Sequence, residues 1–189
     1  MPVAGRISRI EDGTITTAKL VDAAVTNAKL QNDSLTVNGT SIDLGASETI
    51  TAGKVLQIVH GSTTSQASTT AAAQTASNLS AAITPSSTSN KILVMMSTSI
   101  YHSVAAAQTS TTIYRDSTNL GRDDRGIIQF GDFTNRFQAN CTMALIDEPN
   151  TTSSVTYKLY FRNISAGMGA TYIGVDSTPQ WVTLMEIAG

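Results

Sequence analysis

Strict alternation of side chains over residues 154–162 constrains this chain more than any other feature. Every second residue there is large and apolar, and the residues between are polar or amphipathic: Val155, Tyr157, Leu159 and Phe161 against Thr156, Lys158 and Tyr160. A period of two is that of a β-strand with one face in a core and the other in solvent. The stretch therefore predicts a half-buried strand whose apolar face needs a second layer to cover it.

Short apolar stretches of this kind recur from Lys54 to the end, separated by turn-forming clusters such as residues 85–87 and 147–150. We expect nine strands, at residues 55–59, 79–84, 91–101, 109–115, 127–130, 136–146, 154–162, 171–175 and 180–188. Only 14% of the residues are charged, so the helix formers Glu, Lys and Arg are scarce. The pattern predicts an all-β fold, an antiparallel β-sandwich or jelly roll, with Met95, Met96 and Trp181 in its core.

An internal repeat precedes the strands. Residues 14–20 read Thr-Ile-Thr-Thr-Ala-Lys-Leu, residues 24–30 read Ala-Val-Thr-Asn-Ala-Lys-Leu, and a shortened copy follows around Leu35. Each copy carries only two large apolar side chains, too few to bury one another in an extended segment. We expect the segment to order against other copies of itself or against another protein, or else to be a flexible linker. The candidate attachment and trimerisation residues are Ile15, Leu20, Val25, Leu30 and Leu35.

This change in pattern divides the chain near residue 50. We expect residues 1–50 to form an extended segment that carries the repeats and serves attachment and trimerisation. Residues 51–189 hold every expected strand and are long enough to enclose a core of their own, so we expect them to form the β-sandwich head.

Both parts resemble virion proteins of tailed phages. The two repeats, followed by Val-Asn-Gly-Thr-Ser-Ile-Asp-Leu-Gly at residues 37–45, resemble segments of tail-fibre proteins. The head is similar to globular heads of phage proteins, particularly those of cyanophages and marine phages, at residues 53–57, 83–87, 90–94, 114–116, 156–158 and 184–187. The resemblance implies a trimeric jelly-roll head of the tumour-necrosis-factor-like kind, carried on the surface of the virion and made in the host cytoplasm.

Residues 115–136 gather charge in a chain that otherwise avoids it. The candidate interface patch consists of Arg115, Arg122, Asp123, Asp124, Arg125 and Arg136. Arginine suits interfaces because its planar guanidinium group binds a carboxylate with two parallel hydrogen bonds. The segment is either a patch that faces another subunit or partner, or a charged loop that keeps the particle in solution.

We expect no catalytic residue, cofactor or bound metal. His60 and His102 are not accompanied by the Gly-x-Ser-x-Gly turn that presents a serine nucleophile, and Cys141 lies within an apolar strand. The acidic residues do not have the spacing of a calcium-binding loop and are interleaved with arginines, which favours ion pairs or a solvated face. Those acidic residues are Asp116, Asp123, Asp124, Asp132, Asp147 and Glu148.

Charge and hydropathy disfavour two classes of partner. The net charge is −2 and no basic tract occurs, so we expect no nucleic-acid binding. No apolar run is long enough to cross a bilayer, so we expect no membrane insertion.

Together these features favour a non-enzymatic structural protein of a phage particle. It is expected to be a homotrimer that binds other virion proteins, of the tail or the capsid, through its N-terminal segment. As a short tail-fibre-like appendage it would also adhere to a host-surface receptor. The alternative is a trimeric cement or decoration protein that stabilises the phage capsid. A tailspike that cleaves glycans is disfavoured, because the chain lacks the long β-solenoid that usually hosts the paired carboxylates.

Overall fold

The computed structural model describes residues 34–37, 40–46, 54–131, 134–165 and 168–189. These residues belong to two units that divide between Ala52 and Gly53, and each unit is described by itself. The described elements are β-strands, apart from the 3-10 turn η3 (Val175–Ser177).

In the N-terminal unit, β1 (Ser34–Val37) and β2 (Thr40–Asp43) form an antiparallel pair with Leu35 opposite Ile42. Leu35 stays 60% exposed. Two short strands bury too little apolar surface to be stable alone in water. The apolar side chain of the third repeat copy is therefore available to another surface.

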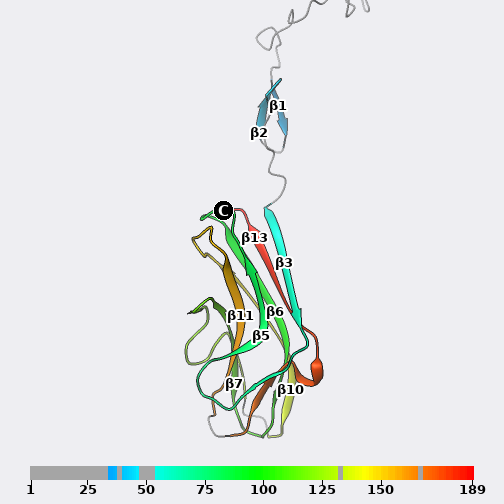
Figure 1. The fold of residues 1–189 in the computed structure, drawn as a ribbon, viewed down its shortest axis with the longest axis vertical. Coiled ribbons are helices and arrows are strands. Elements are labelled where there is room, and N and C mark those ends of the chain that lie inside the picture. Colours follow the sequence, from blue (N-terminus) through cyan, green and yellow to red (C-terminus); the bar gives the residue numbers. More distant parts are fainter. Residues whose placement is uncertain (1–33, 38–39, 47–53, 132–133, 166–167) are drawn as a thin grey trace, which may run out of the picture. The chain divides into compact units, whose positions relative to one another are not determined.

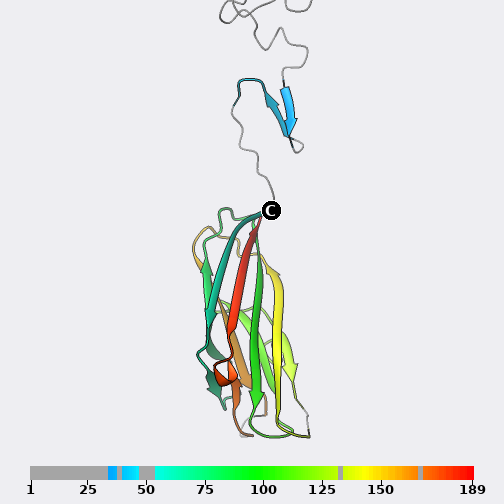
Figure 2. The same ribbon diagram turned by 90° about the vertical axis from the view of Figure 1, so that its right-hand side faces the viewer.

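In the C-terminal unit, one sheet is built around a central strand, and we call it the β6 sheet (Figures 1 and 2). Its strands are β3 (Val55–Thr63), β4 (Ala67–Thr69), β6 (Lys91–His102), β10 (Phe137–Asp147), β12 (Thr171–Ile173) and β13 (Gln180–Ile187). Because β10 occupies one edge of β6 along nearly all its length, β13 and β12 follow one another along the other edge. Next to them lie β3 and β4. In Figure 2, β3, β13, β6 and β10 run side by side.

The second sheet, which we call the β7 sheet, covers the first. Its strands are β5 (Thr75–Ile83), β7 (Thr109–Arg115), β8 (Thr118–Asn119), β9 (Ile128–Phe130) and β11 (Val155–Asn163). The strand order is β5-β11-β7, and β8 and β9 pair with the edge of β7 that β11 leaves free. All the pairings are antiparallel.

The order of the strands is that of a jelly roll. With β3 and β4 taken as one position, β8 and β9 as another, and β12 and β13 as a third, each sheet has four positions. The first long strand, β3, lies beside the last, β13, in the β6 sheet, and β5 lies beside β11 in the β7 sheet. This nesting of late strands against early ones is typical of the double Greek key of a jelly roll. The predicted all-β jelly-roll sandwich is confirmed.

The core lies between the two sheets and follows the predicted alternation. Val155, Tyr157, Leu159 and Phe161 of β11 all point inward and are buried. Alternate residues of the opposing sheet meet them, among them Val94 and Leu184. The buried side chains form one continuous apolar cluster, which also includes Cys141.

Strands built from small or polar residues escaped prediction. β4 and β8 were not expected, and β5 begins at Thr75, ahead of the predicted residue 79. These stretches are rich in Ser, Thr, Ala and Asn and lack large alternating side chains. Their strand geometry comes from pairing with β12, β7 and β11, and sequence periodicity does not report such pairing.

The predicted core position of Trp181 is wrong. Its indole lies on the outward face of the β6 sheet and is 47% exposed, because Val182 and Leu184 occupy the inward positions of β13. Successive side chains of a strand point to opposite faces, so Trp181 must point outward. Met95 is likewise outward and only half-buried, whereas Met96 is buried as expected.

The facing of β11 predicts unequal effects of two adjacent substitutions. Leu159→Ala should reduce the free energy of unfolding by about 2–5 kcal/mol, because it leaves a cavity in the core. Lys158→Ala should change it by less than about 0.5 kcal/mol, because the side chain is half-exposed on the opposite face. Urea unfolding of both variants would measure the difference, and equal destabilisation would contradict the assigned facing.

Candidate functional site

The charged residues predicted to form one patch lie in three places. Arg115 ends β7, residues 122–125 lie between β8 and β9, and Arg136 precedes β10. The 11 residues of β10 span about 36 Å and separate Arg136 from Asp147, the partner of Arg115. Arg115 and Arg136 therefore lie at opposite ends of the sandwich.

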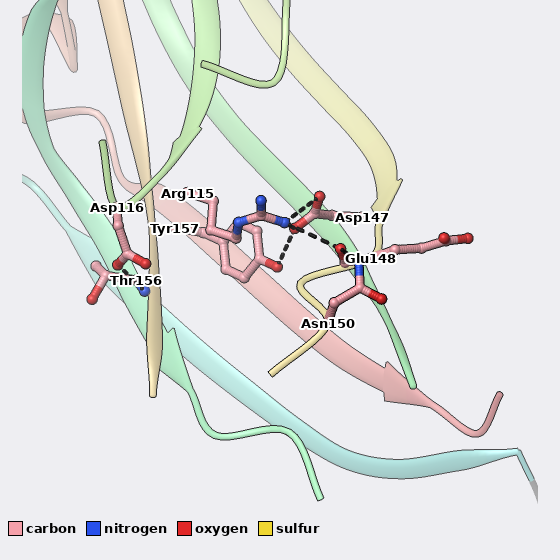
Figure 3. A network of polar contacts seen from close by, with 7 residues as sticks. All are labelled: Arg115, Asp116, Asp147, Glu148, Asn150, Thr156 and Tyr157. Atoms are coloured by element: carbon pink, nitrogen blue, oxygen red, sulfur yellow. Dashed lines mark hydrogen bonds and ion pairs between the residues drawn. The ribbon is translucent and has the colours of Figure 1, made fainter. Parts of the chain in front are cut away.

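Arg115 is bound within its own chain (Figure 3). Its Nη1 donates to both carboxylate oxygens of Asp147, at 2.9 and 2.7 Å, and the Oη of Tyr157 donates to Asp147 Oδ2 at 2.7 Å. The Asp147 side chain is only 11% exposed and that of Arg115 only 22%. Burial raises the pKa of Tyr157, and the hydrogen bond to Asp147 raises it further, so the phenol stays protonated as a donor. The network joins β10 of one sheet to β7 and β11 of the other.

The turn after β7 is fixed beside this network. Asp116 adopts a positive φ of 51° and donates its backbone N–H to the Thr156 carbonyl at 2.8 Å. Its Oδ1 accepts from the Thr156 backbone N–H at 2.9 Å. Aspartate tolerates this left-handed geometry better than most residues. One oxygen of the acidic side chain is thereby used to hold the turn.

The four middle residues of the predicted patch do come together in one exposed loop. Arg122 Nη2 lies 2.9 Å from Asp124 Oδ2, and Arg125 Nε lies 3.7 Å from the same oxygen. Asp123 Oδ1 accepts from Asn119 Nδ2 at 3.2 Å. Exposed pairs of this kind contribute little to folding stability. A role of this loop toward a partner stays a prediction.

The remaining predicted residues are placed as follows. Arg136 Nη1 is 3.5 Å from the hydroxyl of Tyr101. Leu35 is exposed in β1. Ile15, Leu20, Val25 and Leu30 lie outside the described residues, as does Asp132.

A buried carboxylate that sequence reasoning missed lies at the C-terminal end of β13. Glu186 is 1% exposed and accepts four hydrogen bonds: from Gln57 Nε2 at 2.6 Å, from the Ser86 backbone N–H at 2.6 Å and Oγ at 2.8 Å, and from Asn90 Nδ2 at 2.6 Å. None of these donors carries a charge. The signal was present in the sequence, because Glu186 follows Val182 and Leu184 at the inward phase of the strand.

Hydrogen bonds keep Glu186 ionised in spite of its burial. Burial by itself raises the pKa of the carboxyl group, but the donors from Asn90, Gln57 and Ser86 outweigh it and lower the pKa to about 2. These donors come from β3 and from the connection between β5 and β6. The carboxylate therefore ties the first and last strands of the head to that connection.

The histidines and the cysteine do not converge on a reactive site. His60 Nδ1 lies 3.2 Å from Thr183 Oγ1 on the outward face of the β6 sheet. His102 is buried, and burial lowers its pKa against the opposing hydrogen bonds to Asn163 and Val104, so its imidazole is neutral near pH 7. Burial raises the pKa of the Cys141 thiol, which disfavours the nucleophilic thiolate.

Two kinds of feature are absent from the described residues. No three His, Cys, Asp or Glu side chains gather there in a way that could hold a metal ion. No helix in that part of the chain is long and apolar enough to span a membrane.

Arg115 is largely buried and Arg122 is exposed, so we expect their substitution to change the free energy of unfolding by different amounts. Arg115→Ala should lower the free energy of unfolding by about 2–4 kcal/mol, because it leaves the Asp147 carboxylate without its cation in a largely buried site. Arg122→Ala, in the exposed loop, should change it by less than about 0.5 kcal/mol. Denaturant unfolding would compare them, and an unchanged stability of the Arg115 variant would point instead to a role toward a partner.

The low pKa of Glu186 predicts that part of the free energy of unfolding is lost in acid. Its pKa lies below the ordinary 4.5, so the unfolded chain takes up a proton first, and stability should fall as the pH drops from about 4.5 towards 2. Glu186→Gln should remove this component and cost about 1–3 kcal/mol at pH 7. Urea unfolding between pH 7 and 2.5 would measure both effects. The control is Glu148→Gln, which alters an exposed pair with Lys91, and parallel pH profiles of the Glu186 variant and the wild type would contradict the assignment.

Comparison with known proteins gives remote structural likeness and no sequence relative. No protein-family model matches the sequence, and no curated protein matches it. Among solved structures, T=1 particles derived from infectious bursal virus match with a TM-score of 0.37 and 14% identity. The match covers 71% of this chain and 37% of that protein, so this chain corresponds to well under half of its length.

Proposed function

We propose that this protein is a non-enzymatic structural component of a phage particle. In this proposal it is a trimeric, short tail-fibre-like appendage, bound to other virion proteins through residues 1–50 and presenting the jelly-roll head to the host surface. The observation that carries the proposal is the strand order of the head, since jelly rolls recur in viral capsid proteins and in lectins. The step from fold to role is one of analogy, supported by the resemblance of the repeats and head pieces to phage fibre proteins.

The chemistry of the side chains supports a role without catalysis. A nucleophile or general base must reach its substrate, yet Cys141 and His102 are enclosed in the sandwich. Arg115 and Asp147 satisfy one another, and Glu186 is held by neutral donors. These groups hold strands together. That use suits a rigid binding module that carries out no reaction.

A trimeric cement or decoration protein of the capsid is the second candidate. The length of the repeat segment is compatible with it, because two and a half ten-residue copies span only about 80 Å when fully extended. That reach suits an arm lying along a capsid surface as well as it suits a short appendage. Both candidates need apolar attachment through the repeats.

The location of the protein on purified particles tests the proposal. As an appendage it should be present at a low ratio to the major capsid protein, with labelled antibody bound at the tail. A ratio near that of the capsid subunits would favour the cement protein instead, and absence from particles would overturn both candidates.

The repeats allow a matched test of attachment. Leu20→Asp with Leu30→Asp should release the protein from particles, because charges replace the apolar side chains that recur in phase. The control is Thr16→Asp with Thr26→Asp, which adds the same charge at polar positions of the same copies and should leave the protein bound. Western blotting of purified particles would measure retention, and equal retention of both variants would contradict apolar attachment.

A further inference from the structure

The outward face of the β7 sheet carries two stacked tyrosines between two cations. Lys158, Tyr160 and Arg162 take successive outward positions of β11, so the lysine and the arginine lie about 13 Å apart along the strand. Tyr114 of β7 is directly opposite Lys158 and diagonal to Tyr160. The two rings stack, with centroids 4.0 Å apart and 27° between their planes. Together the four side chains make an aromatic surface with a positive charge on either side.

The loop between β8 and β9 borders this surface and is held to the sheet. Arg122 and Gly126 exchange backbone hydrogen bonds of 3.2 and 2.8 Å, which close the loop on itself. Arg162 Nη1 donates to the Asp123 carbonyl at 3.1 Å, so its side chain crosses β7 to reach the loop. The Asp123 carboxylate lies near Tyr114: burial raises the pKa of that phenol, and the negative charge of Asp123 raises it further. We call the following residues the tyrosine site: Tyr114, Asp123, Lys158, Tyr160 and Arg162.

Most polar groups of the tyrosine site have no partner among the described residues, in contrast to the network of Arg115. The Lys158 ammonium group and the hydroxyls of Tyr114 and Tyr160 make no hydrogen bond or ion pair with any described residue. The guanidinium group of Arg162 is bound by one carbonyl and by no carboxylate in the same part of the chain. On the inward face, an arginine, a tyrosine and an aspartate satisfy one another. The same kinds of side chain are left available here for a ligand.

A second observation indicates that Arg162 lacks an acceptor. Ser110 of β7 lies directly opposite it and is 0% exposed. The Ser110 Oγ and the Arg162 Nε are both enclosed and have no hydrogen-bond partner within the described residues. Enclosed polar atoms are nearly always hydrogen-bonded, and both of these can donate. An anionic group bound by Arg162 would supply an acceptor that the described part of the chain does not.

The neighbouring strand β5 carries short side chains beside the tyrosines. Its Ala76 is opposite Tyr160, and its Ser80 is opposite Lys158. These side chains are too short to cover the aromatic rings, whereas the loop of Asp123 borders the rings on the other side. A ligand can therefore approach the rings from the β5 side and meet the cations at the same time.

We propose that the tyrosine site binds an acidic saccharide, a sugar chain that carries carboxylate or sulfate groups. The inference rests on the proposed function and names the kind of host-surface molecule that the head would recognise. The C–H groups of a sugar ring pack on the negative face of an aromatic ring, which the two tyrosines supply. Lys158 and Arg162 bind the anionic groups through charge-assisted hydrogen bonds, and Asp123 and the phenol groups bind the sugar hydroxyls.

The charges of the site favour a saccharide over a polynucleotide. A polynucleotide carries a phosphate at every residue and is bound along a continuous basic groove. The tyrosine site has two cations, and Asp123 and Asp124 place negative charge beside them. A saccharide that combines anionic groups with neutral hydroxyls needs such a mixture of donors and acceptors.

The place of the site on the head agrees with a role toward the host. β3 begins at Val55, at the same end of the sandwich as Glu186, so the chain enters the head there. Arg115 ends β7 at that end, and Thr109 begins β7 at the other. Arg162 lies within one residue pair of Thr109. The site therefore extends toward the end of the head away from the point of chain entry, and all its residues come from one copy.

Calorimetric titration of the full chain tests the class of ligand. The probe is an oligomer of galacturonic acid, and the controls are a maltose oligomer of equal length and a single-stranded DNA. We expect the uronate to bind, the neutral oligomer to bind at least about tenfold more weakly, and uronate binding to weaken as the salt concentration rises. The DNA should bind more weakly than the uronate. Sulfated dextran, compared with the uronate, shows which anionic group the site prefers.

Paired substitutions test the residues. Lys158→Gln with Arg162→Gln should weaken uronate binding by at least about tenfold. The matched control is Lys54→Gln with Arg136→Gln, which removes the same charge at exposed positions elsewhere in the head and should leave the affinity within about twofold. Tyr160→Leu keeps an apolar side chain without the ring and should weaken binding about threefold. Circular dichroism would verify that each variant is folded, and Tyr160→Leu provides the test if the paired variant does not fold.

The outcomes separate this inference from the proposed function. Binding of uronate or sulfated dextran that survives both the paired and the Tyr160 substitutions overturns the assigned site. Equal binding of the neutral oligomer overturns the acidic class, and stronger binding of DNA at the same residues replaces the saccharide by a polynucleotide. Absence of binding to every saccharide overturns the inference, whereas the role as a virion component stands or falls on the location of the protein on particles.

Discussion

The packing of two inward sheet faces on one another is the interaction on which the rest of this structure depends. A strand has a side-chain period of two, so once Leu159 and Val94 are inside, every other residue of β11 and β6 is assigned to a face. The residues between them must then point outward. The exposed side chains of Trp181, Ile58 and Ile146 are therefore consequences of the same alternation that builds the core.

Where the apolar core ends, polar groups replace it. Asp147 and Glu186 both lie opposite Ile92 in the β6 sheet, on either side of it, and so point inward at the same end of the sandwich. At the other end, Thr109 of the β7 sheet and Thr171 of the β6 sheet share a hydrogen bond of 2.6 Å. The sheets are thus joined by apolar contact in the middle and by hydrogen bonds at both ends.

The two carboxylates are stabilised in different ways. Asp147 meets a guanidinium group and a phenol, and this charge-assisted pair offsets much of the cost of burying it. Glu186 has only neutral donors, yet four of them, from segments far apart in the sequence, suffice to keep it ionised. Both carboxylates hold segments of the head together.

Sequence alone determined the class of fold and much of the strand set, because local periodicity records which residues must be buried. The alternation at residues 154–162 specified the facing of β11, and the long strands β6 and β10 lie within one residue of where their apolar runs predicted them. Tertiary structure decided the rest. The partner of Arg115 comes from a strand that begins 22 residues further along the chain, and the donors to Glu186 come from β3 and from the connection before β6. Strands made of small residues, such as β4, exist only because a neighbour pairs with them. Which strands pair, and which distant segments come into contact, is decided only when the two sheets pack around one core. No local sequence pattern carries that information.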